Sequence, residues 1–233
     1  MHRIVTPMCG RYFLNTLPEA LSAQFELTRI PVYEARFNIA PTQHVPVIRE
    51  TDGERTVDAL RWGLVPGWAK DIDIGSRMIN ARTETVTGKP AFRNAWRARR
   101  RCIVPASGFY EWKGDKPPKQ PFAIVPKDGG CFALAGLWEH WQRDDAEPVE
   151  TFTILTRDAD EGMRDLHARM PVMLPRHLYG MWLHGPAEAA ASVLALPNEV
   201  AVHAWPVSRG VNNVRRDDAG LIEPMHGADR YPG

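Results

Sequence analysis

The sequence predicts an α+β fold, a single compact domain with a curved, mostly antiparallel β-rich core flanked by helices. Short runs rich in β-branched and aromatic residues, bounded by Pro and Gly, dominate the 233-residue chain. Helical patterns are fewer, and they interrupt the strands without the regular alternation of a βαβ protein. A chain of this length is expected to bury one sizeable hydrophobic core.

Strand-like segments are spread over most of the chain. Their β-branched and aromatic residues suit the pleated surface of a sheet. The predicted strands, in chain order, are Val45–Arg49, Val57–Trp62, Cys102–Val104, Phe122–Val125, Phe132–Ala135, Thr151–Thr156 and Val202–Trp205. Between two of them, Lys113–Lys119 is rich in Gly, Pro and Lys, which predicts a hairpin-like loop rather than a domain boundary.

Four segments carry helical patterns. They are Pro18–Leu27, Lys89–Arg99, Pro175–Leu183 and Pro186–Leu194. Pro18 falls in a first helical turn, where its missing N–H removes no hydrogen bond. Helical spacing in the second segment places its apolar residues on one side and its arginines on the other.

The domain is expected to span residues 8–223. The chain has no repeat period and no convincing linker, so nothing divides it further. Residues 224–233 are small and polar, and we expect them to form a flexible tail. Residues 1–7 are expected to be a leader, either a start-site artefact or a pro-segment.

The net charge of +1 excludes a grossly basic tail, but it hides a local cluster. That cluster consists of Arg93, Arg97, Arg99, Arg100 and Arg101. Such a cluster fits either phosphate binding or a solvated helix face, and both interpretations stay open. The chain has no apolar run long enough to span a bilayer, and the leader lacks the apolar centre of a secretory signal. We therefore expect a cytoplasmic protein without membrane association.

Cysteine and histidine spacing gives no support for a disulfide framework or a metal site. Cys9, Cys102 and Cys131 are odd in number and widely spaced. The chain has no CxxC pair and no HExxH motif. His177 and His184 could share a helix face, but two ligands alone make a poor metal site. Without GxGxxG or a Walker loop, no nucleotide cofactor is expected either.

Met8-Cys9-Gly10-Arg11 suggests unusual cysteine chemistry. If Met8 is the initiator and is removed, Cys9 carries a free α-amine and a thiol, which together close a thiazolidine ring on an aldehyde. Their ordinary pKa values, about 7.7–8.0 and about 8.5, leave both partly reactive near neutral pH. An internal Cys9 has an amide nitrogen and cannot form the imine. The alternative interpretation is a buried structural cysteine.

Glu111 and His167 are candidates for proton transfer. Glu111 lies in Gly108-Phe109-Tyr110-Glu111-Trp112, and apolar surroundings would raise its pKa toward that of a general acid. The alternative is an alternating strand that leaves Glu111 in water. His167 is of the residue type best suited to shuttle protons near pH 7, although a lone histidine is commonly structural.

Polar and aromatic residues elsewhere suit nucleic-acid binding. Asn80 offers an amide to orient a polar group, and Arg82 offers a guanidinium for phosphate. Trp62 and Trp68 lie in a Gly/Pro-containing segment. Such aromatics either stack on unpaired bases or belong to the core.

Seven short motifs, taken in this order, resemble the SRAP family (SOS-response-associated peptidases, or abasic-site-processing proteins) over nearly the whole chain. The motifs are Met8-Cys9-Gly10-Arg11, Phe37-Asn38-Ile39-Ala40-Pro41, Trp62-Gly63-Leu64-Val65-Pro66-Gly67-Trp68, Asn80-Ala81-Arg82-Thr83-Glu84, Gly108-Phe109-Tyr110-Glu111-Trp112, Asp165-Leu166-His167-Ala168-Arg169-Met170-Pro171, and Pro206-Val207-Ser208-Arg209 with Val211-Asn212.

The resemblance implies a DNA-damage response protein that senses abasic sites in single-stranded DNA. It implies a covalent thiazolidine link between the sugar aldehyde and Cys9, which shields the lesion. Glu111 would assist sugar ring opening, proton transfer and reversal of the link. His167 would act on the imine step, and Asn80 would orient the amine or the sugar.

The same resemblance assigns the DNA contacts. Arg11, Arg82 and Arg169 would hold backbone phosphates. Asn38 and Trp68 would line the DNA path, and Ser208 is assigned to DNA binding as well. The partner is single-stranded DNA containing abasic sites, the expected state is a monomer, and no metal or cofactor is implied.

The leader departs from the family pattern, in which the chain begins at the Met-Cys pair. Translation from Met8, or self-cleavage or host cleavage before Cys9, would expose the cysteine. Two other functions stay open. One is a cysteine peptidase that uses Cys9, His167 and Glu111 as nucleophile, base and orienting group. The other is a non-catalytic single-stranded DNA-binding module.

Overall fold

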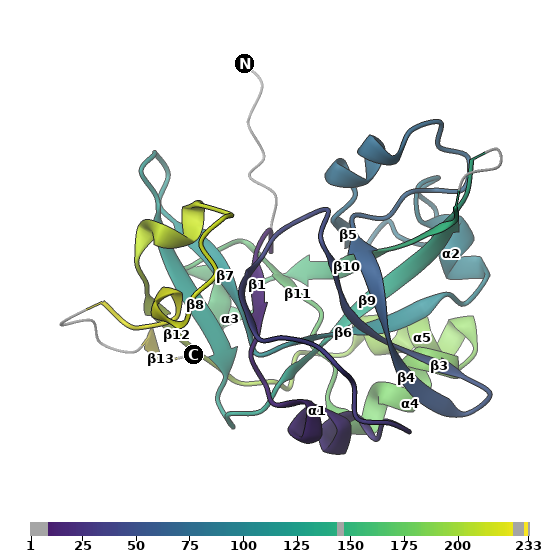
Figure 1. Ribbon diagram of the computed structural model, residues 1–233, viewed down its shortest axis with the longest axis horizontal. Helices are drawn as coiled ribbons and strands as arrows, with labels where there is room; N and C mark the ends of the chain where they lie inside the picture. Colours follow the sequence, from purple (N-terminus) through teal and green to yellow (C-terminus); the bar gives the residue numbers. More distant parts are fainter. Residues whose placement is uncertain (1–8, 144–146, 226–230, 233) are drawn as a thin grey trace.

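The computed structural model describes residues 9–143, 147–225 and 231–232, arranged as two β-sheets with short helices at their margins (Figure 1). The predicted α+β class is confirmed. Most strand pairs are antiparallel, but β10 (Val149–Asp158) pairs in parallel with β4 (Glu54–Trp62) and with β5 (Asn80–Arg82). The predicted leader lies outside the described residues.

The larger sheet closes on itself. Its strands follow the order β10, β4, β3 (His44–Thr51), β6 (Arg101–Ala106) and β9 (Phe132–Trp141), and β9 then pairs with β10. The C-terminal half of β10 also pairs with β5 on one side and with β11 (Arg169–Pro171) on the other. This closure forms a small barrel that extends at one end through β5 and β11.

The second sheet carries β7 in its interior. Its strands are ordered β13 (Tyr231–Pro232), β12 (Val202–Pro206), β8 (Gln120–Pro126), β7 (Gly108–Lys113), β1 (Tyr12–Leu14) and β2 (Arg36–Ile39). β7 and β8 form an antiparallel hairpin, so the loop predicted at Lys113–Lys119 is confirmed. Because β6 and β7 are separated by Ser107 alone, the chain passes directly from the barrel into this sheet.

The main core joins the two sheets. Tyr12 of β1 packs edge-on against Trp62 of β4, with 5.2 Å between ring centroids, and Trp62 stacks near Phe152 of β10. All three rings are fully buried. The start of β1 is therefore fixed against the barrel wall, and this contact determines where Cys9 lies.

The helices are short. They are α1 (Pro18–Phe25), α2 (Arg93–Arg97), α3 (Glu161–Arg164), α4 (Tyr179–His184) and α5 (Ala187–Ala195), with 3₁₀ turns η1 (Ile72–Arg77), η2 (Arg176–Leu178), η3 (Arg209–Asn212) and η4 (Ala219–Leu221). The helix predicted from Pro18 ends at Phe25 because Glu26 adopts a left-handed conformation with φ 55°. The predicted Lys89–Arg99 helix shrinks to α2, and the predicted Pro175–Leu183 helix begins as η2.

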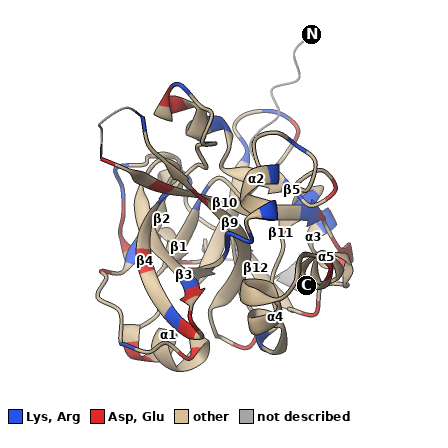
Figure 2. Ribbon diagram, turned by 90° about the vertical axis from the view of Figure 1, so that its right-hand side faces the viewer, with Lys and Arg blue, Asp and Glu red and all other residues tan. Residues whose placement is uncertain are grey.

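The arginine cluster is not one exposed basic face. Arg101 is buried on β6, where it donates hydrogen bonds to the carbonyls of Trp182 and Gly185. Arg100 pairs with Glu139. The other three members are exposed, and Figure 2 shows Lys and Arg segments around α2 and β5. The basic-face interpretation is therefore wrong for Arg100 and Arg101, whose side chains stabilise the fold.

The remaining expectations concern the tail, the cysteines and membrane association. Within the predicted tail, Tyr231–Pro232 pairs with β12, while residues 226–230 and 233 lie outside the described part. All three cysteines are buried and free. In the part of the chain that the structure describes, no helix has the length and apolar character needed to cross a bilayer. The same residues contain no group of three or more His, Cys, Asp or Glu side chains arranged to hold a metal ion.

Candidate active site around Cys9

Cys9 lies just before β1 and is completely buried. Its backbone is left-handed, with φ 43°, a conformation that few residues other than Gly adopt. Burial, and secondarily the charge of Glu111, raise the pKa of its thiol well above the ordinary value. The thiol is therefore protonated near neutral pH in this arrangement.

The backbone N–H of Cys9 donates a hydrogen bond to Oε1 of Glu111, with 2.7 Å between the two atoms. The contact spans 102 positions of sequence. It forms because β1 and β7 are neighbours, with Tyr12 opposite Phe109 and the Tyr110 N–H donating to the Arg11 carbonyl. Sheet pairing thus brings the carboxyl to the nitrogen that would be the α-amine in a chain beginning at Cys9.

Glu111 is buried, with 3% of its surface exposed. Burial raises the pKa of its carboxyl to about 8, although hydrogen bonds from the backbone of Cys9 and Trp112 and the charge of Lys119 oppose the shift. Both faces of β7 are covered, Phe109 by the main core and Tyr110 by a second cluster around Phe13. The interpretation that leaves Glu111 in water is therefore wrong.

His167 lies between α3 and β11 and is half-buried. The Arg169 N–H donates to its Nδ1 at 3.2 Å. Burial lowers the pKa of the imidazole, a hydrogen bond with the Arg169 backbone opposes the shift, and the charges of Lys119 and Arg169 add to the lowering. His167 is therefore neutral at pH 7 and able to accept a proton. Lys119 acts on the pKa values of both His167 and Glu111, so the two candidate groups share its electrostatic environment.

Arg11 and Asn38 are in direct contact. Nη1 of Arg11 donates to Oδ1 of Asn38 at 2.9 Å and to the Val211 carbonyl at 2.8 Å. Asn38 is fully buried, and its amide nitrogen donates to backbone carbonyls of residues 211–216. Asn38 therefore lies behind the surface, where it supports Arg11.

The other predicted DNA contacts differ in how free their side chains are. Arg169 is engaged by Glu84, Asp158 and a backbone carbonyl. Arg82 is exposed on β5, next to the half-buried Asn80. Ser208 is exposed, and its hydroxyl accepts a hydrogen bond from the Gly210 N–H in η3.

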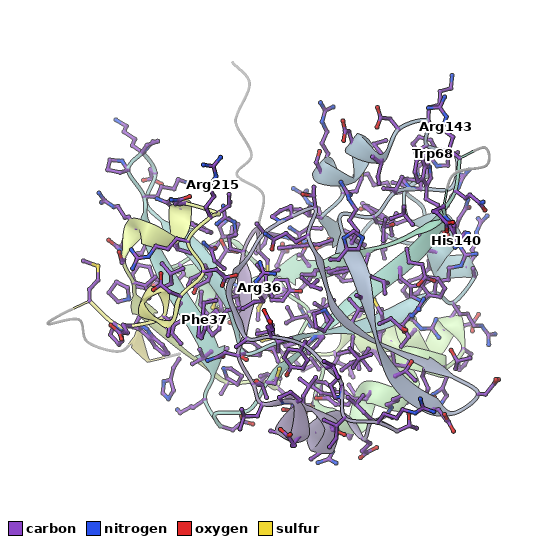
Figure 3. All side chains as sticks on the ribbon, viewed as in Figure 1. Arg36, Phe37, Trp68, His140, Arg143 and Arg215 are labelled. Carbon is purple, nitrogen blue, oxygen red and sulfur yellow. The ribbon has the colours of Figure 1, made fainter. Side chains whose placement is uncertain are left out.

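The two tryptophans of the Gly/Pro segment have opposite environments. Trp62 is core, whereas Trp68 is 55% exposed and donates its indole N–H to the Pro90 carbonyl at 3.3 Å. Figure 3 shows Arg36, Phe37 and Arg215 on the side of the second sheet and Trp68, His140 and Arg143 at the far end of the barrel. Aromatic and cationic side chains thus lie both on the side of the second sheet and at the far end of the barrel.

Sequence reasoning missed Lys119 and Asp217. Lys119 lies at the end of the β7–β8 loop, and only the hairpin register places it near Glu111. Asp217 accepts hydrogen bonds from the backbone of β2 across about 180 positions of sequence. No local pattern marks either residue, because each acts through a contact made by distant strands.

Comparison with known proteins identifies relatives over nearly the whole chain. The family model described as SOS response associated peptidase (SRAP) matches residues 8–214. The abasic site processing protein YoaM of Bacillus subtilis is 39% identical over 224 residues, which cover 93% of this chain and 98% of that protein. The abasic site processing protein YedK of Escherichia coli is 33% identical, with coverage of 94% and 100%.

Solved structures share the architecture. A crystal structure of a protein from Bacteroides thetaiotaomicron has a TM-score of 0.79 at 24% identity, with coverage of 93% of this chain and 100% of that chain. One from Bordetella bronchiseptica has a TM-score of 0.73 at 29% identity, with coverage of 86% and 100%. With a family model that matches residues 8–214 and full-length relatives above 30% identity, this chain belongs to the SRAP family.

Proposed function

We propose that this protein processes abasic sites in single-stranded DNA by linking Cys9 covalently to the open-chain sugar aldehyde. Relatives that carry the name abasic site processing protein support the substrate class. The observation that carries the chemistry is the 2.7 Å contact between the Cys9 nitrogen and the Glu111 carboxyl. A carboxyl group that accepts a hydrogen bond from the attacking nitrogen lies close enough to take up and return the protons that imine formation moves.

The reaction balances with loss of one water. The α-amine of a chain beginning at Cys9 attacks the aldehyde carbon, and the resulting hydroxyl leaves as water to give an imine. The thiol then adds across the C=N bond, with sulfur on carbon and hydrogen on nitrogen. With a pKa of about 8, Glu111 is mainly protonated at pH 7 and donates the proton that the departing hydroxyl needs. Its carboxylate then takes the thiol proton.

His167 and Asn80 assist at the sugar in this proposal. The neutral imidazole of His167 accepts a proton from a sugar hydroxyl during ring opening, because its lowered pKa keeps it unprotonated at pH 7. Asn80 orients the sugar or the amine through its amide. Reversal of the link follows the same steps backwards, with water attacking the imine.

DNA binding in this proposal uses the exposed cations and Trp68. Arg11 and Arg82 hold phosphates, and Trp68 offers a face on which a base stacks. Arg169 is paired with carboxylates and supports the DNA-binding surface. Ser208 contributes a hydroxyl at the η3 turn. The protein acts as a monomer on the nucleoid DNA, which light scattering with and without DNA would test.

The mechanism requires Cys9 to be the first residue. Translation from Met8, or cleavage before Cys9 by the protein or its host, provides the free amine. The matched family region begins at Met8, which fits either route. Intact-mass measurement of protein made in its native host tests this requirement, and a mass that includes residues 1–8 contradicts it.

The decisive experiment mixes single-stranded DNA carrying one abasic site with protein that begins at Cys9 or at Met1. Denaturing mass spectrometry should detect protein plus DNA less one water only when Cys9 is first. Cys9→Ala should bind the DNA and give no thiazolidine product. No adduct from either form would refute the proposal.

A peptidase function is a rival to this assignment, and the buried thiol argues against it as a general activity. A cysteine nucleophile acts as a thiolate, whereas burial raises the pKa of the Cys9 thiol. We restrict peptidase activity to self-processing. One residue added before Cys9 should abolish DNA linkage but would spare general peptide cleavage. A non-catalytic binding module would hold intact and abasic DNA alike and would survive Cys9→Ala.

A further inference from the structure

Arg11 is oriented by partners that carry no charge. Its Nη1 donates to the amide oxygen of Asn38 and to the backbone carbonyl of Val211. Within the described residues, no carboxylate pairs with Arg11. Burial lowers the pKa of the guanidinium, but no ion pair with a described residue neutralises its charge. Both hydrogen bonds use Nη1, so the Nε and Nη2 edge is its other set of donors. Such an edge fits two oxygens of a phosphate.

Three backbone carbonyls fix the orientation of the Asn38 amide. Its nitrogen donates to Val211 at 3.3 Å, Asn213 at 3.0 Å and Arg216 at 2.7 Å. A flipped amide would place its oxygen against these carbonyls, so the nitrogen faces them and the oxygen faces Arg11. One buried side chain thus joins the 211–216 loop to Arg11.

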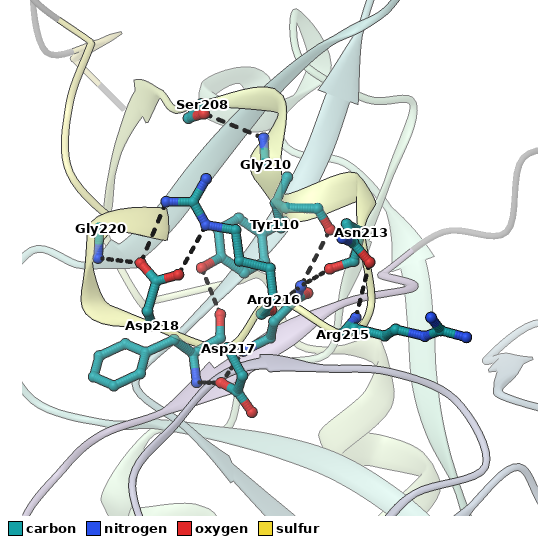
Figure 4. Close-up of polar contacts among 12 residues, drawn as sticks. Tyr110, Ser208, Gly210, Asn213, Arg215, Arg216, Asp217, Asp218 and Gly220 are labelled. Carbon is teal, nitrogen blue, oxygen red and sulfur yellow. Dashed lines mark hydrogen bonds and ion pairs between the residues drawn. The ribbon is translucent and has the colours of Figure 1, made fainter.

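Asp217, which directly follows residues 211–216, fixes the backbone of β2. Its Oδ1 accepts hydrogen bonds from the N–H groups of Phe37 and Asn38, and its Oδ2 pairs with Arg36. The Tyr110 hydroxyl donates to the Phe37 carbonyl at 2.8 Å, from the residue next to Glu111 (Figure 4). Three consecutive residues of β2 are therefore held by one carboxylate.

We propose that Asn38 and Asp217 form a clasp, defined as the contacts of these two side chains with β2, Arg11 and residues 211–216, and that the clasp positions Arg11 on a DNA phosphate beside the lesion. The proposal rests on the proposed function. Asn38 and Asp217 are positioning residues, because both act through Arg11. A neutral orienting partner is what phosphate binding requires, since a carboxylate in place of Asn38 would neutralise the guanidinium.

Asp217→Ala and Asp218→Ala make a matched pair. Asp218 is the adjacent carboxylate, but its hydrogen bonds are with the Arg216 side chain and the Gly220 N–H rather than with β2 or Arg11. The probe is labelled single-stranded DNA with a stable abasic analogue, bound without covalent chemistry in a Cys9→Ala background. We expect Asp217→Ala to weaken binding about tenfold, as for one lost charge-assisted contact, and Asp218→Ala by less than about twofold.

A double-mutant cycle with Arg11→Ala separates positioning from general structural damage. If Asp217 acts through Arg11, Asp217→Ala should change affinity by less than about twofold once Arg11 is gone. Equal weakening in both backgrounds overturns the proposal. Asp217→Asn keeps an oxygen acceptor for the two backbone N–H groups, so it should recover most of the affinity.

Kinetics give a second readout in protein that retains Cys9. Asp217→Ala should raise the DNA concentration that gives half-maximal linkage and leave the rate at saturation unchanged, because Cys9 lies just before β1, Glu111 lies on β7, and the hydrogen bonds of Asp217 are with β2. A fall in the saturated rate alone would contradict the positioning role.

The outcomes distinguish this inference from the function on which it rests. Suppose that no linkage forms, but Asp217→Ala and Arg11→Ala both weaken DNA binding and their effects are coupled. That result supports the clasp and refutes the thiazolidine chemistry. If Asp217→Ala binds DNA as tightly as Asp218→Ala, the clasp is refuted, whether or not the thiazolidine link forms. Protein that binds no single-stranded DNA refutes both.

Discussion

Glu111 and Cys9 illustrate what a local sequence can predict about a residue. The aromatic neighbours of Glu111 pointed to a raised pKa, and burial on β7 produces that shift. Local spacing could not supply its partner, because 102 positions separate the Cys9 nitrogen from the carboxyl, and only the family resemblance put the two residues in one reaction. Likewise, the sequence marked Asn38 as a site residue but not as a buried one, since its burial depends on carbonyls contributed by residues 211–216.

Glu111→Gln removes a proton donor and should slow linkage formation and its reversal by about 10²–10⁴. Rates at saturating abasic DNA, followed by denaturing gel from pH 6 to pH 9, give the measurement. The pH profile of the wild-type rate should show a titrating group near pH 8, and the profile of Glu111→Gln should lack it. A variant with wild-type rates in both directions would show that Glu111 has no part in proton transfer.

Burial of Glu111 also couples stability to pH. Its folded pKa of about 8 lies above its ordinary 4.5, so between these values the folded state binds more protons than the unfolded state. The free energy of unfolding should therefore fall as pH rises through this window, by at most about 1.4 kcal/mol per pH unit. Urea denaturation at pH 5 and pH 8 should show that Glu111→Gln loses this decline, whereas Glu19→Gln, at an exposed site, keeps it.

At the scale of elements, the seven predicted strands were found, but the short strands β1, β2, β5, β11 and β13 were not predicted, and neither were the helix lengths. Each predicted strand lies within an observed strand, because β-branched and aromatic runs bounded by Pro and Gly mark strands well. The predicted Lys89–Arg99 helix is shorter than expected and ends at Arg97, because Arg99 adopts φ 54° and Arg101 turns into the core. Those tertiary contacts override a helical pattern that local spacing alone supported.

Gly108 allows β1 and β7 to approach closely. A Cβ at this position would lie 2.2 Å from the ring of Phe13 and 2.6 Å from the Ile124 carbonyl. Gly108→Ala should therefore lower the free energy of unfolding by about 1–3 kcal/mol and slow linkage by shifting Cys9 from Glu111. Urea denaturation tests the first effect. Gly88→Ala is the control, since nothing lies within 4 Å of its added Cβ; equal stabilities would contradict the close-approach argument.

For the whole molecule, the sequence predicted the fold class but not the division of strands between sheets. No local sequence pattern indicates that β9 pairs with β10 and so closes the barrel, or that β12 pairs with β8. Sheet membership depends on pairings over long sequence separations, and turn residues specify only neighbours such as β7 and β8. The packing of Tyr12 on Trp62 then fixes one sheet on the other.

Electrostatic attraction of DNA depends on the charges of the whole molecule. The salt dependence of the DNA affinity reports how many phosphates the protein contacts. Arg82→Gln should weaken single-stranded DNA binding and reduce the slope of log affinity against log salt by about 0.7. Arg176 pairs with Glu26 beside the end of α1, away from β5, so Arg176→Gln is the matched control. Fluorescence anisotropy at several salt concentrations gives the slopes, and equal slopes for the two variants would remove Arg82 from the interface.

The clasp has a consequence for synthesis on the ribosome. Cys9 and Arg11 are synthesised before Glu111, and Asp217 is synthesised well after all three. A nascent or prematurely terminated chain therefore carries the thiol without the carboxyl that would activate it and without the loop that orients Arg11. The arrangement of Cys9, Glu111 and an oriented Arg11 is thereby absent until Asp217 has been made and the loop has folded, and a chain that stops before Asp217 should bind abasic DNA more weakly.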